Sequence, residues 1–83
     1  RDAFFHLLLF YIPMGGKTMI QVNGAPLDGF AGKTVAELLE AQGCAPARVA
    51  VERNGAIVRR VDFDHVTLAE EDKIEIVHFV GGG

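Results

Sequence analysis

Hydrophobic and polar residues alternate in several short segments that follow Met19. A period of two is typical of strands with one buried face, and it predicts strands over residues 19–22, 27–30, 49–53, 56–59 and 73–80. Asn23-Gly24 and Asn54-Gly55 each suit a two-residue hairpin turn, because both residues tolerate a positive φ. They predict that the first two strands form one hairpin and the next two another. Pro26 places the second strand near an edge of the sheet.

One segment has helical spacing instead. Val35, Leu38 and Leu39 recur on one helical face, and Thr34 and Glu37 have the three-residue separation of a capping box. Gly43 is a natural stop, so the helix is predicted over residues 35–42. Strands on both sides of a single helix indicate an α+β fold, with the helix packed on one face of a mixed sheet.

The segment between the fourth and fifth predicted strands is expected to be an irregular crossing. Val61, Phe63 and Val66 are its candidate core residues. Glu70-Glu71-Asp72 is interpreted as a solvated turn before the last strand. Ile74, Ile76 and Val80 share a parity in that strand and are expected to meet the helix.

The first eighteen residues differ from the rest, because residues 3–14 are apolar apart from His6. This run is shorter than the roughly 20 residues that a membrane span needs, and it lacks the cleavage site of a signal peptide. We interpret residues 1–18 as an apolar extension, from a start assigned upstream in error or from an expression artefact. Residues 19–80 are then the folded domain, and residues 81–83 a flexible glycine tail.

Size and charge limit the function classes. A chain of 83 residues has room for one small domain with little core to spare for a catalytic cavity, which favours a carrier or binding module over an enzyme. The net charge of −3 argues against nucleic acid as a partner and suits a protein with a basic docking face. The apolar run is too short to suggest a membrane partner.

The numbers and spacing of cysteine and histidine residues argue against a disulfide, a CxxC redox pair and a metal site. Cys44 is the only cysteine, so no internal disulfide or CxxC pair can form, and a cytoplasmic location is expected. His6, His65 and His78 show no metal-ligand spacing, so no metal site is predicted. Because Cys44 follows the helix, far from the chain's end, it is not assigned a role in chemistry at that end.

Gly81, Gly82 and Gly83 follow the last predicted strand without a linker. Such a tail can be a frayed end without function. It also suits a carrier whose terminal carboxylate an enzyme activates, because residues without Cβ pass through a narrow channel and adopt any φ and ψ it requires. On that interpretation Gly83 is the reactive residue, and Gly81 with Gly82 forms the part that threads into the enzyme.

Several segments, taken in this order, resemble the thiamine-biosynthesis sulfur carriers (ThiS-like proteins). The resemblance covers Met19 to Gly83 and rests on residues 20–24 (IQVNG), 33–39 (KTVAELL), 49–58 (VAVERNGAIV), 72–77 (DKIEIV) and 80–83 (VGGG). Many members carry Gly-Asp before the last strand, where this chain has Glu71-Asp72. That difference concerns only the geometry of the turn.

The resemblance implies a β-grasp (ubiquitin-like) fold and a carrier that is not itself an enzyme. An E1-like adenylyltransferase would use ATP to adenylate Gly83, and sulfur from a cysteine desulfurase system would convert the adenylate to a thiocarboxylate. Thiazole synthase would then take the sulfur to build the thiazole ring of thiamine. The carrier itself would bind no cofactor.

A candidate partner-binding face follows from the parity of the last strand. Val77 and Phe79 point away from the helix, just before the tail, and Val58 is included with them. Alternatively, the extension or a loop covers Phe79. Three other functions stay open: the small subunit of molybdopterin synthase, a ubiquitin-like modifier of lysines, and an interaction domain with an inert tail.

Overall fold

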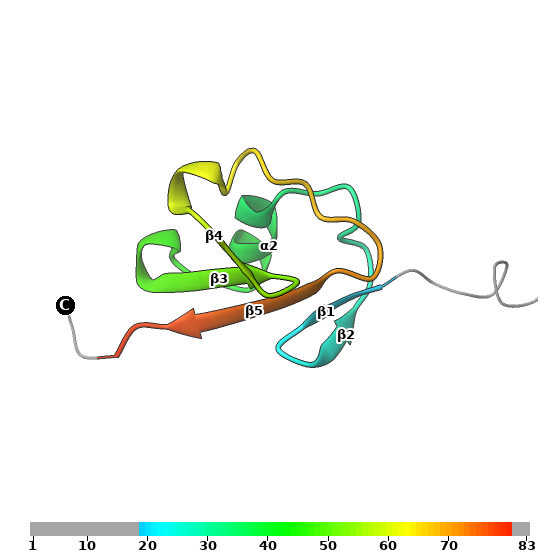
Figure 1. Cartoon of the computed structure of the whole chain (residues 1–83), viewed down its shortest axis with the longest axis horizontal. Helices are drawn as coiled ribbons and strands as arrows, with labels where there is room; N and C mark the ends of the chain where they lie inside the picture. Colours follow the sequence, from blue (N-terminus) through cyan, green and yellow to red (C-terminus); the bar gives the residue numbers. More distant parts are fainter. Residues whose placement is uncertain (1–18, 81–83) are drawn as a thin grey trace, which may run out of the picture.

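Two hairpins are joined through the last strand of the chain (Figure 1). The computed structural model describes residues 19–80. Its elements are, in order, β1 (Ile20–Val22), β2 (Ala25–Leu27), α2 (Val35–Ala41), the 3₁₀ helix η1 (Pro46–Arg48), β3 (Val49–Arg53), β4 (Ala56–Val58), the 3₁₀ helix η2 (Arg60–Asp62) and β5 (Lys73–His78). The strands form one five-stranded sheet in the order β2-β1-β5-β3-β4. β5 is thus central, parallel to β1 and antiparallel to β3.

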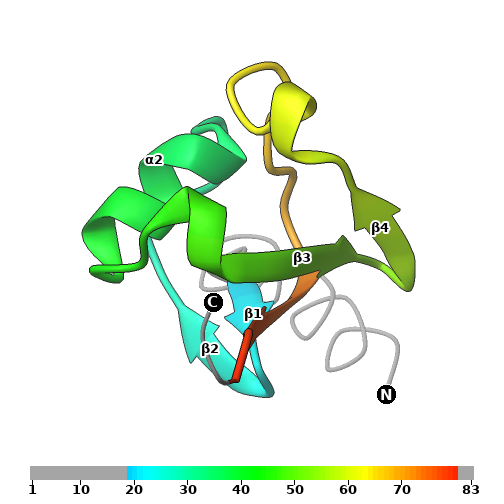
Figure 2. The ribbon, with the colours of Figure 1, turned by 90° about the vertical axis from the view of Figure 1, so that its left-hand side faces the viewer.

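α2 and the segment between β4 and β5 lie on the same side of the sheet (Figure 2). The buried core lies between them and the strands, and consists of Ile20, Val22, Val35, Leu38, Leu39, Val49, Val51, Phe63, Leu68, Ile74 and Ile76. Within residues 19–80 no element covers the other side of the sheet. This is the predicted α+β architecture, a mixed sheet with one main helix in the β-grasp arrangement.

Both predicted Asn-Gly turns are confirmed. Asn23 and Gly24 have φ values of 51° and 85°, and Asn54 and Gly55 have 53° and 87°. Positive φ at both central residues matches the twist of a two-residue hairpin, so the second strand starts directly after the turn. The prediction for β2 was therefore wrong by two residues, since it spans Ala25–Leu27 rather than 27–30. β2 is an edge strand, as Pro26 indicated.

The helix prediction is confirmed to within one residue. α2 spans Val35–Ala41, and Gly43 follows with a φ of 73°, the left-handed conformation that commonly ends a helix. At its start, the Glu37 N–H donates to Thr34 Oγ1 at 3.1 Å, and the Thr34 N–H donates to Glu37 Oε1 at 2.8 Å. The bond from the Thr34 backbone is the main cause that lowers the pKa of Glu37.

The connector between β4 and β5 packs against the start of α2. The Ala36 N–H donates to Phe63 O at 2.9 Å, and the Val35 N–H donates to Val66 O at 3.0 Å. These bonds satisfy N–H groups that have no partner within the helix itself. They hold Phe63 in the core, where it is 4% exposed, with Val66 half-buried beside it.

Val61 was wrongly expected in the core, since it is 68% exposed. It lies within η2, which turns it away from the neighbouring Phe63. Leu68 is buried instead, at 1% exposure. Backbone bonds on both of its groups hold it there: the Leu68 N–H donates to Lys33 O and its carbonyl accepts from Gly32 N–H.

The last strand was predicted too long. β5 ends at His78 rather than Val80, because β3 offers its last partner at Val49. Ile74 and Ile76 lie in the core as predicted, but Val80, of the same parity, is 97% exposed. Beyond the end of the sheet, parity no longer points a side chain toward the helix.

Candidate functional site at the end of β5

β5 brings the end of the chain to one side of the domain. His78 pairs with Val49, and the Phe79 N–H donates to Arg48 O at 2.9 Å. Phe79 is thus the last residue held to the sheet within residues 19–80, and the fully exposed Val80 follows it. Gly81, Gly82 and Gly83 lie outside the described residues. They come directly after this exit, and their roles as threading tail and reactive end stay predictions.

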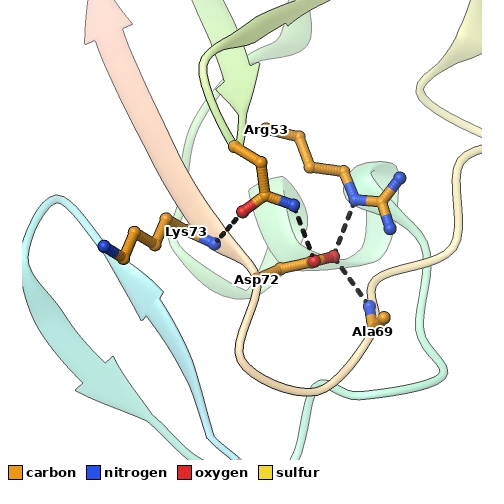
Figure 3. A network of polar contacts seen from close by, with 5 residues as sticks. Arg53, Ala69, Asp72 and Lys73 are labelled. Atoms are coloured by element: carbon orange, nitrogen blue, oxygen red, sulfur yellow. Dashed lines mark hydrogen bonds and ion pairs between the residues drawn. The ribbon is translucent and has the colours of Figure 1, made fainter.

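The other end of β5 is held by a buried carboxylate (Figure 3). Asp72 Oδ2 accepts from Arg53 Nε at 2.7 Å and from the Ala69 N–H at 2.8 Å, and Asp72 Oδ1 accepts from Asn54 Nδ2 at 2.9 Å. Asn54 Oδ1 in turn accepts from the Lys73 N–H at 2.9 Å. One side chain thus ties the β3–β4 turn to the start of β5.

The predicted solvated turn at 70–72 was therefore wrong at Asp72, which is 5% exposed. Desolvation by itself would raise the pKa of Asp72. The hydrogen bonds from Ala69, Asn54 and Arg53, together with the Arg53 charge, outweigh desolvation and lower the pKa. Asp72 is therefore a fully satisfied structural anion rather than an acid or base.

Asn23 holds the middle of β5. Its Oδ1 accepts from the Ile76 N–H at 2.7 Å, and its Nδ2 donates to Ile76 O at 3.2 Å. An amide side chain carries both a donor and an acceptor, so it can satisfy both backbone groups of one residue. Sequence reasoning assigned Asn23 only to the turn. The missed signal is the asparagine itself, since a glycine would also suit the turn but could not make these bonds.

The open face of the sheet, on the side away from α2, carries an apolar patch beside the exit of the tail. Val77 is 57% exposed and Phe79 61%, as the alternation of the last strand predicts. Val77 pairs with the half-buried Ala50 of β3, which extends this apolar patch. That the patch docks a partner stays a prediction.

Val58 does not belong to this patch. It pairs with Val51, which is fully buried, so both side chains point to the core side of the sheet. Its neighbour Ile57 pairs with Glu52 and lies on the open face, 64% exposed, on the far edge strand. The inclusion of Val58 in the candidate partner face was thus wrong by one residue of strand parity.

Two carboxylates lie beside the apolar patch. Glu52 and Glu75 are cross-strand partners on the open face, and neither forms an ion pair within residues 19–80. Like charges directly opposite each other destabilise a sheet. A basic partner surface would relieve this repulsion, which agrees with the partner charge expected from the composition.

The remaining candidate residues form no site in the described part of the chain. Among residues 19–80 no three acidic, histidine or cysteine side chains are grouped to hold a metal. Cys44 is half-buried and packs against the core, while His65 and His78 are exposed. His6 lies outside the described residues. No helix within residues 19–80 is long and apolar enough to span a membrane.

Comparison with known families gives a match over the whole of the described domain. The model of the ThiS family matches residues 18–83. The chain belongs to the ThiS family. This agrees with the resemblance on which the sequence interpretation rests, and the matched range includes the three terminal glycines.

Relatives of this ThiS-family chain fall into two groups. The sulfur carrier protein ThiS of Bacillus subtilis is 39% identical over 66 residues, which are 78% of this chain and 100% of that protein. A thiazole synthase of Magnetococcus marinus is 52% identical over 64 residues, which are 77% of this chain but 20% of that protein. The chain thus spans about a fifth of the length of this second kind of relative.

A solved structure supports the fold. The crystal structure of the thiamine biosynthesis protein ThiS from Geobacter metallireducens superimposes with a TM-score of 0.65 at 41% identity. The match covers 78% of this chain and 99% of that one. The β-grasp fold expected for the ThiS family is confirmed.

Proposed function

We propose that this ThiS-family chain is a sulfur carrier in thiamine biosynthesis, and that the carboxylate of Gly83 is the group that carries sulfur. The observation that supports this most is the family match to residue 83, combined with a central strand that releases the chain at Val80, directly before the glycines. The anchored domain serves as a handle, and the tail brings the reactive group to an enzyme.

The chemistry needs partner enzymes. A carboxylate is a poor electrophile, so an E1-like adenylyltransferase activates Gly83 with ATP to form an acyl-adenylate. Sulfur from a cysteine desulfurase system, delivered as a persulfide, then displaces AMP, and a thiol reductant releases the product as a thiocarboxylate, which thiazole synthase uses as its sulfur source. The chain is a covalently modified co-substrate in this scheme, binds no cofactor of its own, and acts in the cytoplasm where ATP is available.

The relatives favour thiamine over the other pathways considered. Two curated proteins that contain a similar segment are named thiazole synthase. The two similar solved structures are both described as thiamine biosynthesis proteins, which agrees with the same pathway. A small subunit of molybdopterin synthase would share the tail chemistry but deliver sulfur to another acceptor. A ubiquitin-like modifier would instead form isopeptide bonds with lysines.

The test compares the native C-terminus with one extended by an alanine after Gly83. Both proteins are incubated with ATP, a sulfur donor and the E1-like enzyme, and intact masses are measured. The extension moves the carboxylate outward by up to roughly 3.5 Å and adds a Cβ, so it should abolish adenylate and thiocarboxylate formation, because reacting atoms must approach to about 3–3.5 Å. Equal modification of both proteins would refute the carrier function.

A second step identifies the acceptor. The thiocarboxylate form is mixed with thiazole synthase and its other substrates, and loss of sulfur from the carrier is followed by mass. Return of the native carboxylate supports the thiamine pathway. Retention of the sulfur, or linkage of Gly83 to lysines, would support one of the alternatives.

A further inference from the structure

Successive residues of β5 direct their backbone N–H and C=O groups to opposite sides of the strand. The Asn54 N–H donates to Lys73 O and the Phe79 N–H donates to Arg48 O, so these cross-strand pairs are hydrogen-bonded. Hydrogen-bonded and non-hydrogen-bonded pairs alternate in an antiparallel ladder. The pair Val49–His78 is therefore non-hydrogen-bonded. The N–H and C=O of His78 point away from β3, toward the side of β5 on which β1 lies.

β1 ends before it reaches His78. On this side of β5 the Gln21 N–H donates to Asp72 O and the Asn23 N–H donates to Ile74 O. The Asn23 side chain then satisfies Ile76, and the chain turns back into β2. Within residues 19–80, nothing bonds to the backbone N–H or C=O of His78.

Beyond Asn23, the backbone of His78 and Val80 on the β1 side of β5 is therefore left without a neighbouring strand in the described part of the chain. We call this unpaired stretch of backbone the β5 notch. His78 is exposed and Val80 is 97% exposed, so the notch is open to solvent. Unpaired N–H and C=O groups of this kind are a template for another strand. Val77 and Phe79 flank it with exposed apolar side chains, within reach of residues on an added strand.

The two outer edges of the sheet are protected in ways that the notch is not. β2 carries Pro26 opposite Gln21, where its missing N–H faces outward from the sheet. β4 is three residues long and is followed by Arg59 and Arg60. Short edges, proline and basic side chains all oppose strand addition. The notch lacks such protection, and it lies immediately before the tail.

We propose that the β5 notch pairs with an extended segment of thiazole synthase, which continues the position of β1 along β5 toward the tail. This inference rests on the proposed function. Thiazole synthase is the occupant because two relatives of that name contain a segment similar to this chain within one polypeptide. A protein that accepts the tail must also line its path, and the notch is the backbone that comes directly before Gly81. Strand addition would hold the tail in register as it enters the active site.

Hydrogen exchange tests the geometry directly. In the free protein the His78 amide should exchange rapidly, whereas the Phe79 amide, bonded to Arg48 O, should be slow. Addition of thiazole synthase should slow exchange at His78 and Val80. The inference would be overturned if the wild-type protein binds thiazole synthase while its His78 amide still exchanges as fast as in the free protein.

Proline substitution tests the proposed hydrogen bond from the His78 backbone N–H to the added strand. His78→Pro removes the outward N–H, a change that Pro26 shows this fold tolerates at an equivalent position. It should leave the thermal midpoint of the free protein nearly unchanged and weaken binding to thiazole synthase about tenfold or more, the effect of one lost hydrogen bond and an unpaired acceptor in the interface. Wild-type affinity in a folded His78→Pro protein would overturn the inference.

Ile57→Pro is the matched control. Ile57 lies one pair from the Asn54-Gly55 turn, so its N–H also faces outward, but on the far edge strand β4. It should fold and bind with wild-type affinity. His78→Ala keeps the backbone N–H and measures how much the side chain contributes to affinity. The loss of affinity in His78→Pro must exceed the loss in His78→Ala. If His78→Pro fails to fold, exchange at the wild-type amide still decides.

Failure of the proposed function gives a different result. If the wild-type chain is not converted to a thiocarboxylate by the E1-like enzyme, the carrier function falls and this inference with it. If the thiocarboxylate forms, and thiazole synthase binds His78→Pro and wild type equally, only the notch is refuted.

Discussion

Three polar side chains position β5 at the residue scale. Asn23 and Asn54 each occupy the first position of a hairpin turn with positive φ, and each directs its amide to β5 or the residue before it. Asp72, the residue directly before the strand, completes the set. Asparagine adopts positive φ more readily than most residues and carries both a donor and an acceptor. The same residues therefore form the turns and align the strand that leads to the tail.

Asp72→Asn should lower the free energy of unfolding by about 2–3 kcal/mol at pH 7. The amide removes the charge that Arg53 faces and places a donor against one of the groups that now donate to the carboxylate. Denaturant unfolding followed by circular dichroism measures the difference. A loss below about 0.5 kcal/mol would show that the buried network contributes little.

The same variant has an expected pH dependence. Because folding lowers the pKa of Asp72 from its ordinary value of 3.8, the folded state binds fewer protons than the unfolded state at acid pH. The stabilisation is therefore present above pH 3.8 and is lost as the pH falls through the folded pKa. The gap between wild type and Asp72→Asn should narrow in acid. Glu71→Gly is the control: it removes a neighbouring carboxylate at a φ of 69°, which favours glycine, and should not destabilise the protein.

At the scale of elements, β5 performs several tasks with separate sets of atoms. Ile74 and Ile76 fill the core, while Val77 and Phe79 face solvent on the open face. Its backbone pairs with β3 from Ile74 to His78 but with β1 only at Lys73 and Ile74, which leaves the last residues for the proposed notch and the tail. A period of two lets one six-residue strand contribute to the core, to the proposed partner face and to the exit of the tail.

Phe79→Asp should weaken binding to the partner enzymes by at least about tenfold while changing the thermal midpoint little. Phe79 is 61% exposed and contributes its backbone rather than its side chain to the fold. Exposed substitutions usually change stability by about 0.5 kcal/mol or less, whereas a charge in an apolar interface is costly. Affinity is measured by calorimetry, and stability by thermal unfolding.

Ile57→Asp is the matched control for Phe79→Asp. Ile57 lies on the same face with 64% exposure, but on the far edge strand. Its substitution should leave partner affinity at the wild-type level. Equal losses in both variants would show that the partner covers the whole face, and a large loss of stability in Phe79→Asp would place Phe79 in the core.

At the scale of the molecule, residues 19–80 contain a complete sheet, helix and core. Eleven buried hydrophobic side chains form one cluster between α2, the connector and the sheet. Neither face of the sheet needs residues 1–18 to cover it. One face is buried under α2 and the connector, and the other is the face proposed to dock a partner. The division of the chain at residue 18 stays a prediction.

A chain that begins at Met19 should fold with the same thermal midpoint as the full chain, within about 2 °C, and be adenylated at the same rate. The expectation follows because the buried cluster needs no further apolar surface. Thermal unfolding and the mass assay for adenylation measure the two quantities. A truncated chain that is unfolded would show that the domain begins before Met19.

Sequence alone determined the features that depend on neighbouring residues. The Asn-Gly turns, the capping box of Thr34 and Glu37, and the alternation in β5 are local, because each involves residues within a few positions of one another. Together with the family resemblance they were enough to predict the sheet, the helix and the end at which the tail leaves. The exposed Val77 and Phe79 followed from parity alone.

Only the tertiary structure decided contacts between distant residues. Asn23 and Ile76 are 53 positions apart, and Asp72 is 19 from Arg53, so no local pattern relates them. Parity also fails across strands: it orders residues within one strand, but the face of Val58 depended on its pairing with Val51. The open backbone at His78 arises because the last residue of β1, Val22, pairs with Ile74, and the Asn23 side chain reaches only as far as Ile76. Register between strands set this difference, and register is a property of the assembled sheet.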